Sequence, residues 1–373
     1  MNQAVSRSVC CLGRLRREGK MRRKVTLKDI AEQTGVTAAS VSMILNGKEL
    51  SRFTPELVEK VLICARKLQY VPPSGRNKAR QIAVISPSMN NAYHTTIMMG
   101  IDRAALASGY IAQLYNTYWN PHVELSILNM LEQHRVAGII YLMNPLQAER
   151  AREIDRHTPV VAIGDIVNDL GIDTVDVNNF KAGEMVAEYL IGLGHRHIAY
   201  LTTSLNAHHI SRVRRCEGLQ AAFRRLCPDG SVKVYCKDNS YEQEIQSPFI
   251  ELDSGRELAY ECIRNPEITG IVAINDMVGY GVLDGLIEKG FRVPEDYSLC
   301  GFDNVFPSGF HRMEITSVDH STQEHGASAF HLLKNRLEKL TEKPTEYPIT
   351  RLEYRSRLVI RGSTGAPREQ RAE

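Results

Sequence analysis

The sequence predicts a small all-α unit followed by a larger α/β body made of two doubly wound parallel-sheet subdomains. Near the start of the chain, residues 26–47 read as two short helical segments joined by a glycine. From residue 82 onward, short apolar strands alternate with amphipathic helices, a pattern typical of parallel sheets covered by helices. Because these units are too many for one ordinary sheet, we expect two subdomains with a cleft between them.

Charge is distributed unevenly along the chain. Residues 1–80 contain 17 Lys and Arg against 6 Asp and Glu, a net charge of +11, whereas the remainder carries −8. A basic first part on an acidic body suggests that the first part contacts nucleic acid. The sequence shows no membrane-spanning run and no signal peptide, and its eight cysteines show no metal-ligand spacing. We therefore expect a cytoplasmic protein with reduced thiols.

The first helical pair, in residues 24–70, has recognisable start and stop signals. Thr26 can cap a first helix with Asp29 as its capping-box partner, and Gly35 suits a left-handed turn. Thr37 can cap a second helix over residues 38–45. This spacing predicts a helix-turn-helix. A third helix is expected over residues 54–68; it begins with Thr-Pro-Glu, and its apolar residues complete the core.

A helix-turn-helix with basic surroundings predicts DNA binding, with the second helix in the major groove. Ser40 and Ser42 are expected to bond bases or phosphates. The phosphate backbone is expected to be contacted by Lys28, Lys48 and Arg52. Such contacts fix the position of the protein on the duplex and do not read the base sequence.

Residues 71–81 read as a linker, because Pro72, Pro73 and Gly75 oppose a helix there. Residues 1–23 are expected to form a disordered extension. Two interpretations remain open for it. In the first, the codons of RREGK form a purine-rich ribosome-binding site and translation starts at Met21. Residues 1–20 would then be upstream DNA that was translated by mistake. Alternatively, they form a basic arm that grips phosphates.

The α/β body follows in order. The expected strands are IAVIS (82–86), YIAQLY (110–115), VAGIIYLM (136–143), PVVAIGD (159–165), HIAYLTT (197–203), VKVYC (232–236), GIVAIN (270–275) and SLCGFD (298–303). The expected helices include residues 93–109, 121–134, 180–194, 211–226, 254–265 and 276–290.

Polar residues fall at the ends of these strands, where cleft residues of such folds belong. They are Asp165, Asn275, Asp276 and Asp303. Carboxylates and amides suit hydroxyl-rich or amine-bearing ligands, although Asp276 can simply cap the next helix. We find no nucleotide-binding glycine motif and no catalytic constellation, and the His195–His197 connector lacks a third metal ligand. We therefore expect no enzyme, no cofactor and no metal.

Several stretches resemble the lactose-repressor (LacI) family of bacterial transcription regulators over residues 24–362. They include VTLKDIAEQTGVTAASVSMILNG, LQYVP, NNFKAGEMVAEYLIGLGHRHIAYL, VPEDYSLCGFDN and ITSVD. The resemblance implies a homodimeric, nucleoid-associated regulator, by expectation a repressor, which binds a pseudo-palindromic DNA operator. It also implies a periplasmic-binding-protein-like domain over residues 82–362 that binds a carbohydrate or related small-molecule effector.

The resemblance also implies how that domain divides. The N-subdomain would comprise about residues 82–176 and 320–347, and the C-subdomain about 177–319 and 348–362, followed by a tail over 363–373. The chain would thus cross between the subdomains near residues 176, 319 and 347.

For the DNA-binding site, the family's base-reading positions fall on Ala38, Ala39 and Met43. These side chains make no bidentate hydrogen bonds but can contact thymine methyl groups, which suggests an unusual operator. The complete predicted DNA-binding set is Thr26, Lys28, Thr37, Ala38, Ala39, Ser40, Ser42, Met43, Asn46, Lys48 and Arg52.

For the effector site, the family's characteristic arginine falls on Arg215, whose guanidinium suits vicinal hydroxyls or a carboxylate. A stacking aromatic of several relatives falls near Ile250, with Phe249 beside it. The complete predicted effector set is Tyr93, His94, Asp165, Arg215, Phe249, Asn275 and Asp303. Two other classes remain open: a solute-binding protein of similar fold and an enzyme of doubly wound fold.

Overall fold

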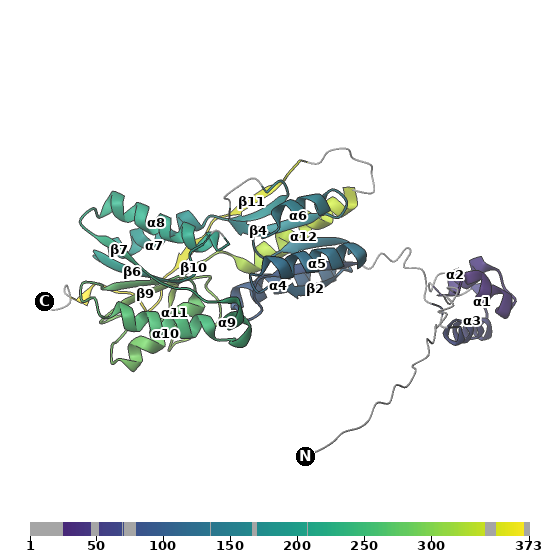
Figure 1. Cartoon of the computed structure of the whole chain (residues 1–373), viewed down its shortest axis with the longest axis horizontal. Helices are drawn as coiled ribbons and strands as arrows, with labels where there is room; N and C mark the ends of the chain where they lie inside the picture. The colour runs from purple at the N-terminus through teal and green to yellow at the C-terminus, as the bar shows by residue number, and fades with distance from the viewer. Residues whose placement is uncertain are drawn as a thin grey trace, which may run out of the picture. The chain divides into compact units, whose positions relative to one another are not determined.

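The structure is a computed structural model that describes residues 25–45, 52–68, 70, 80–134, 136–165, 170–206, 208–339 and 348–368. It divides into two units, residues 1–76 and 77–373, and Figure 1 labels their helices and several strands. The predicted extension 1–23, most of the predicted linker 71–81, and Asn46 and Lys48 lie outside the described residues.

The first unit is a three-helix domain made of α1 (Leu27–Thr34), α2 (Ala38–Leu45) and α3 (Pro55–Lys67). The capping box between Thr26 and Asp29 is present, and Gly35 has a φ of 78° at the C-cap of α1. The Thr37 Oγ1 accepts a hydrogen bond from the Ser40 backbone N–H at 3.1 Å and so caps α2. The buried core consists of Ile30, Val41, Ile44, Val61, Cys64 and Ala65. These contacts confirm the predicted helix-turn-helix.

The second unit contains two six-stranded sheets. The first has the order β11-β5-β4-β3-β1-β2, and every neighbouring pair is parallel. Its strands are β1 (Gln81–Ser86), β2 (Ile111–Asn116), β3 (Gly138–Tyr141), β4 (Val160–Asp165), β5 (Asp173–Val177) and β11 (Arg351–Tyr354). We call this sheet with its covering helices the N-subdomain.

The second sheet has the order β12-β10-β9-β8-β6-β7 and is parallel except at its edge, where β12 runs antiparallel to β10. Its strands are β6 (His197–Thr203), β7 (Ser231–Lys237), β8 (Gly270–Ala273), β9 (Ser298–Phe302), β10 (Thr316–Asp319) and β12 (Arg357–Val359). We call this sheet with its helices the C-subdomain. The two sheets confirm the predicted fold class.

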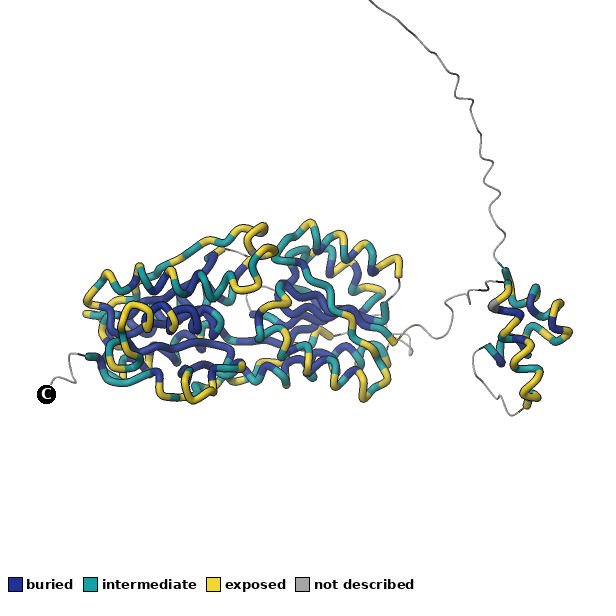
Figure 2. Tube along the Cα trace, turned by 90° about the horizontal axis from the view of Figure 1, so that it is seen from below, coloured by how far each residue is buried: buried dark blue, intermediate teal, exposed yellow. Residues whose placement is uncertain are grey.

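Helices cover both faces of each sheet, and Figure 2 shows the strands buried beneath them. In the N-subdomain, α4 (Ala92–Ala107) and α12 (Thr322–Lys339) pack on one face, and α5 (Pro121–His134) and α6 (Ala148–Asp155) on the other. The helices of the C-subdomain, which Figure 1 labels, are α7 (Asn179–Gly192), α8 (Ile210–Leu226), α9 (Tyr241–Gln246), α10 (Ile250–Cys262) and α11 (Asp276–Glu288).

Glycines let α7 and α8 approach each other closely. A Cβ atom on Gly183 would lie 2.2 Å from the Arg215 carbonyl oxygen, and one on Gly218 would lie 2.0 Å from the Phe180 carbonyl oxygen. Since backbone cannot move away as a flexible side chain can, these two positions require glycine. The pair therefore fixes the position of α8, which carries Arg215.

Two boundary predictions need correction. The third crossing was expected near residue 347, but β11 pairs with β5 of the N-subdomain, so the chain crosses at residues 355–356. Because β11 is largely exposed, its residue types do not indicate which of the two sheets it joins. The predicted tail is also wrong up to residue 368, because Ser363 is buried and its hydroxyl donates to the Leu299 carbonyl at 2.6 Å.

Candidate functional site

The predicted DNA-reading helix α2 presents a small and mostly apolar outer face. Ala39 and Thr37 are exposed, and Ala38, Ser42 and Met43 are half-buried. On the opposite face, Val41 and Ile44 are buried in the core of the first unit. Of the remaining described members of the predicted set, Thr26, Lys28 and Arg52 are exposed and Ser40 is half-buried.

The predicted role of Ser40 is affected by its local contacts. Its hydroxyl lies 3.0 Å from the Thr37 hydroxyl, and its backbone N–H donates to the same Thr37 oxygen. Ser40 therefore takes part in the cap of α2, which is a structural role that the sequence pattern did not separate from a DNA contact.

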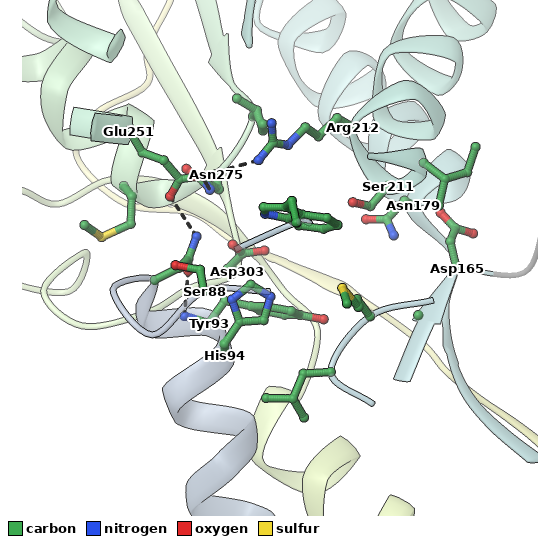
Figure 3. Close-up of a pocket in the computed structure, with 18 of the residues that line it drawn as sticks. Ser88, Tyr93, His94, Asp165, Asn179, Ser211, Arg212, Glu251, Asn275 and Asp303 are labelled. Atoms are coloured by element: carbon green, nitrogen blue, oxygen red, sulfur yellow. Dashed lines mark hydrogen bonds and ion pairs between the residues drawn. The ribbon is translucent and has the colours of Figure 1, made fainter. Parts of the chain in front are cut away.

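A polar cleft lies between the two subdomains of the second unit, at the carboxyl ends of strands from both sheets (Figure 3). The cleft brings together six of the seven predicted effector residues, namely Tyr93, His94, Asp165, Arg215, Asn275 and Asp303. Phe249 is not among them: its side chain is 61% exposed, and the neighbouring Ile250 lines the cleft instead. Phe249 is the N-cap residue that precedes the first residue of α10.

Arg215 is buried, and its guanidinium makes four polar contacts within the protein. Its Nε donates to Asn179 Oδ1 at 2.7 Å, and its Nη1 donates to the Ile274 carbonyl. Its Nη2 lies 3.1 Å from Asp303 Oδ1 and 3.3 Å from His320 Nε2. Four contacts to the protein leave this guanidinium with little free capacity for a ligand.

These contacts join Arg215 to all three crossings between the subdomains. Asn179 follows the first crossing, and His320 follows the second. Because Nε2 of His320 accepts from Arg215, its Nδ1 carries the proton and donates to Ser356 Oγ at 2.8 Å, on the third crossing. The cleft and the hinge between the subdomains thus share one hydrogen-bonded network.

Asp303 sits in a strained backbone conformation beneath the cleft. Its φ is 95°, a value that non-glycine residues rarely adopt and that is found mainly at functional sites. Burial raises the pKa of its carboxyl, while the charge of Arg215 acts in the opposite direction. The ion pair with Arg215 therefore offsets only part of the cost of burying this carboxylate.

Glu251, which the sequence analysis missed, connects the two sides of the cleft. It accepts hydrogen bonds from Asn91 Nδ2 of the N-subdomain at 2.8 Å and from Asn275 Nδ2 of the C-subdomain at 3.0 Å. Arg212 Nη2 lies 3.7 Å from a Glu251 carboxylate oxygen, and Figure 3 shows Glu251, Asn275 and Arg212 close together. Arg212 is one helical turn before Arg215 on α8, so helical periodicity could have identified it.

Trp119 is a second residue that the sequence analysis missed. It occupies the turn between β2 and α5, which is closed by a hydrogen bond from the Asn120 N–H to the Thr117 carbonyl at 2.9 Å. Its two central residues, Tyr118 and Trp119, have φ values of 51° and 58°. Positive φ costs a bulky residue on the order of 1–3 kcal/mol, so strain accompanies the position of Trp119.

From this turn, the indole of Trp119 reaches residues of the opposite subdomain. Its ring centroid lies 4.4 Å from that of His209, and the Arg212 guanidinium lies 5.9 Å from the ring. Burial lowers the pKa of His209 to about 2, helped by the nearby Arg212 charge, so this imidazole is neutral. Trp119 is also the only tryptophan of the chain.

Two adjacent residues at the start of α4 contribute further polar groups to the cleft. Burial lowers the pKa of His94 to about 3, and the positive charge of Arg212 acts in the same direction. Its Nδ1 is buried and has no hydrogen-bond partner among the described residues. Burial, followed by the charge of Asp303, raises the pKa of Tyr93, so its hydroxyl keeps its proton. Both side chains can therefore exchange neutral hydrogen bonds with a ligand.

Metal binding and membrane insertion find no support in the described part of the chain. No group of three or more His, Cys, Asp or Glu side chains there is placed to hold a metal ion. None of the described helices is long and apolar enough to cross a membrane. Within the His195–His197 connector, His195 is buried, and its Nδ1 lies 2.8 Å from the Thr269 hydroxyl oxygen.

A helix-turn-helix unit, together with a two-subdomain unit that carries a polar cleft at its strand ends, defines a ligand-responsive DNA-binding regulator. Comparisons identify the family. Residues 26–73 match the family described as bacterial regulatory proteins, lacI family. Residues 79–357 match the periplasmic binding proteins and sugar binding domain of LacI family. The chain therefore belongs to the LacI family and is a transcriptional regulator, which confirms the predicted family.

Individual relatives agree with this assignment. The chain is 28% identical over 358 residues to the HTH-type transcriptional repressor PurR of Histophilus somni (strain 129Pt), covering 91% of this chain and 98% of that protein. A LacI-family transcriptional regulator from Silicibacter pomeroyi has a similar fold, with a TM-score of 0.73, 24% identity, and coverage of 91% and 99%. A LacI-family regulator from Enterococcus faecium, solved with bound ribose, has a TM-score of 0.63 and 24% identity, and covers 77% and 99%.

Proposed function

We propose that this regulator is a homodimeric repressor that acts in the cytoplasm, and whose affinity for a pseudo-palindromic operator changes when a carbohydrate-like effector binds the cleft. The observation that carries the proposal is the network around Arg215. One guanidinium joins residues of all three crossings to the cleft. A ligand that alters this network acts directly on the relative positions of the two subdomains.

The effector would contact the polar residues that the cleft leaves facing inward. Tyr93, His94 and Asp165 belong to the N-subdomain, whereas Asn275 and Asp303 belong to the C-subdomain. A ligand held between them favours the closed arrangement, because only that arrangement supplies both sets of contacts. Its influence on DNA is limited by its difference in affinity for the two arrangements.

DNA would be bound by α2 and its surroundings. Ala38, Ala39 and Met43 offer apolar contacts to thymine methyl groups, whereas Lys28 and Arg52 offer positive charge to phosphates. Two copies of this unit in a dimer would read the two halves of one operator.

Selection of duplexes from a random-sequence library tests the DNA part of this proposal. The full chain should enrich a pseudo-palindromic site, and a Met43→Arg variant should enrich a different one. Light scattering of the full chain should give the mass of a dimer. Enrichment of no particular sequence, or a monomeric mass at working concentration, would contradict the proposal.

A further inference from the structure

Carboxyl groups outnumber guanidinium groups in the lining of the cleft. Asp165, Glu251 and Asp303 line it, and Arg212 and Arg215 are the only Lys or Arg residues among the described residues of its lining. His94 adds no positive charge at neutral pH, since burial lowers its pKa to about 3.

Both guanidinium groups are engaged by the protein. Arg215 bonds Asn179, the Ile274 carbonyl and Asp303, as described above. Arg212 donates to the Thr203 hydroxyl at 2.6 Å and lies 3.7 Å from Glu251. A negatively charged ligand would have to break these pairs while lying close to carboxylates, whereas hydroxyl groups can donate to those carboxylates without any such loss.

The indole of Trp119 offers a broad apolar surface within this polar cleft. The ring is half-buried, and from the opposite subdomain the neutral His209 ring and the Arg212 guanidinium lie against it. The turn at Tyr118 and Trp119 keeps an aromatic residue at the cleft in a strained backbone conformation, where glycine would avoid the strain. The C–H face of a saturated ring can lie against such a surface while its hydroxyl groups reach the polar residues around it.

We propose that Trp119 is a specificity-determining residue on which the effector's ring lies, and that the effector carries hydroxyl groups and no negative charge. Phosphorylated and carboxylated compounds are thereby excluded as effectors. This inference rests on the proposed function, in which the cleft is the effector site.

The sign of the charge in the cleft can be tested without a ligand, because all tryptophan emission of the chain comes from Trp119. The quenching constants of caesium and of iodide are measured on the full chain. Each is divided by the constant of the same ion for free N-acetyltryptophanamide. We expect the normalised caesium constant to exceed the iodide constant by about threefold or more. Equal constants, or stronger quenching by iodide, would overturn the proposed charge preference.

A matched pair of variants on α10 assigns the effect to the cleft. Glu251→Gln removes a carboxylate that lines the cleft, and should lower the caesium-to-iodide ratio. Glu261→Gln removes a carboxylate from an exposed position of the same helix, and should leave the ratio unchanged. If both variants behave alike, the charge around Trp119 does not come from the cleft, and the proposal fails.

The ligand class is tested with pairs of uncharged sugars and their monophosphates, beginning with D-ribose and D-ribose 5-phosphate, by calorimetry and Trp119 emission. Every binder should be uncharged and should change the emission. Trp119→Ala should weaken its binding by about tenfold or more, and Trp119→Phe by less. Tighter binding of a phosphate than of its parent sugar, a binder indifferent to Trp119→Ala, or no uncharged binder would each refute the inference.

The outcomes also separate this inference from the proposed function. A phosphorylated compound that binds the cleft and changes DNA affinity would contradict the inference and leave the proposed function standing. An uncharged compound that binds on Trp119 without changing DNA affinity would contradict the proposed function alone.

Discussion

Replacement of Arg215 by methionine should destabilise the second unit strongly. Methionine keeps much of the apolar stem but removes every hydrogen bond of the guanidinium to Asn179, Ile274, Asp303 and His320. The Asp303 carboxylate, 5% exposed, would remain buried without its ion-pair partner. Breaking a buried pair in this way costs about 3–5 kcal/mol of unfolding free energy.

Urea denaturation followed by Trp119 emission measures this loss, because the only tryptophan of the chain lies in the second unit. Arg225→Met on the same helix is the control, since Arg225 is solvent-exposed and pairs with Glu188 at the surface. Its midpoint should stay near that of the wild type.

A double-mutant cycle isolates the pair itself. Asp303→Asn removes the uncompensated charge. The double variant Arg215→Met with Asp303→Asn should therefore lose less unfolding free energy than the two single variants together, by about 1–3 kcal/mol. A loss below about 1 kcal/mol for Arg215→Met, or additive losses in the cycle, would refute the account of Arg215 as the centre of the hinge network.

Three further predictions concern packing, pH and DNA. Gly218→Ala should lower the unfolding free energy by about 1–3 kcal/mol, because its Cβ would lie 2.0 Å from the Phe180 carbonyl oxygen. Gly192→Ala in α7, where nothing lies within 4 Å, should stabilise slightly in the same urea assay, and the reverse order would contradict the packing argument. His325 is fully buried against Tyr354, and burial lowers its pKa to about 4, below its unfolded value of roughly 6.5. The unfolded state therefore binds this proton more tightly, so the contribution of His325 to stability is complete above about pH 6.5 and falls toward pH 4 by about 1.4 kcal/mol per pH unit. His325→Phe should flatten that slope in thermal melts recorded across this range, and an unchanged slope would assign the acid sensitivity elsewhere. Lys28→Ala should weaken DNA binding and reduce its salt dependence by about one counterion, as measured by gel shift, without changing the melting of the protein. An unchanged salt slope would remove Lys28 from the phosphate contacts.

Local chemistry made much of the fold predictable. Thr26, Gly35 and Thr37 mark helix ends through contacts that span only a few residues, and the structure contains those contacts. Asp165, Asn275 and Asp303 were predicted because strand ends of a parallel sheet meet at one edge, and the strands themselves were visible as apolar runs.

The rest depends on how the two subdomains meet. Glu251 is an ordinary helix residue until Asn91, far away in the chain, donates to it across the cleft. Trp119 lies in a turn whose backbone angles have no signature in its residue types, since aromatic side chains rarely occupy positive φ. Phe249 lies outside the cleft lining, and the chain crosses at residues 355–356 instead of near 347, because neighbouring residues share composition but not position in the assembled fold.

The most direct test of the account is the affinity of the full chain for its selected operator, measured with and without a compound that calorimetry shows to bind the cleft. We expect a saturating concentration of the compound to change the dissociation constant for the operator by about fivefold or more, and we expect Glu251→Ala to abolish this change. An operator affinity that stays the same while the compound is bound would contradict the central claim that the cleft controls DNA binding.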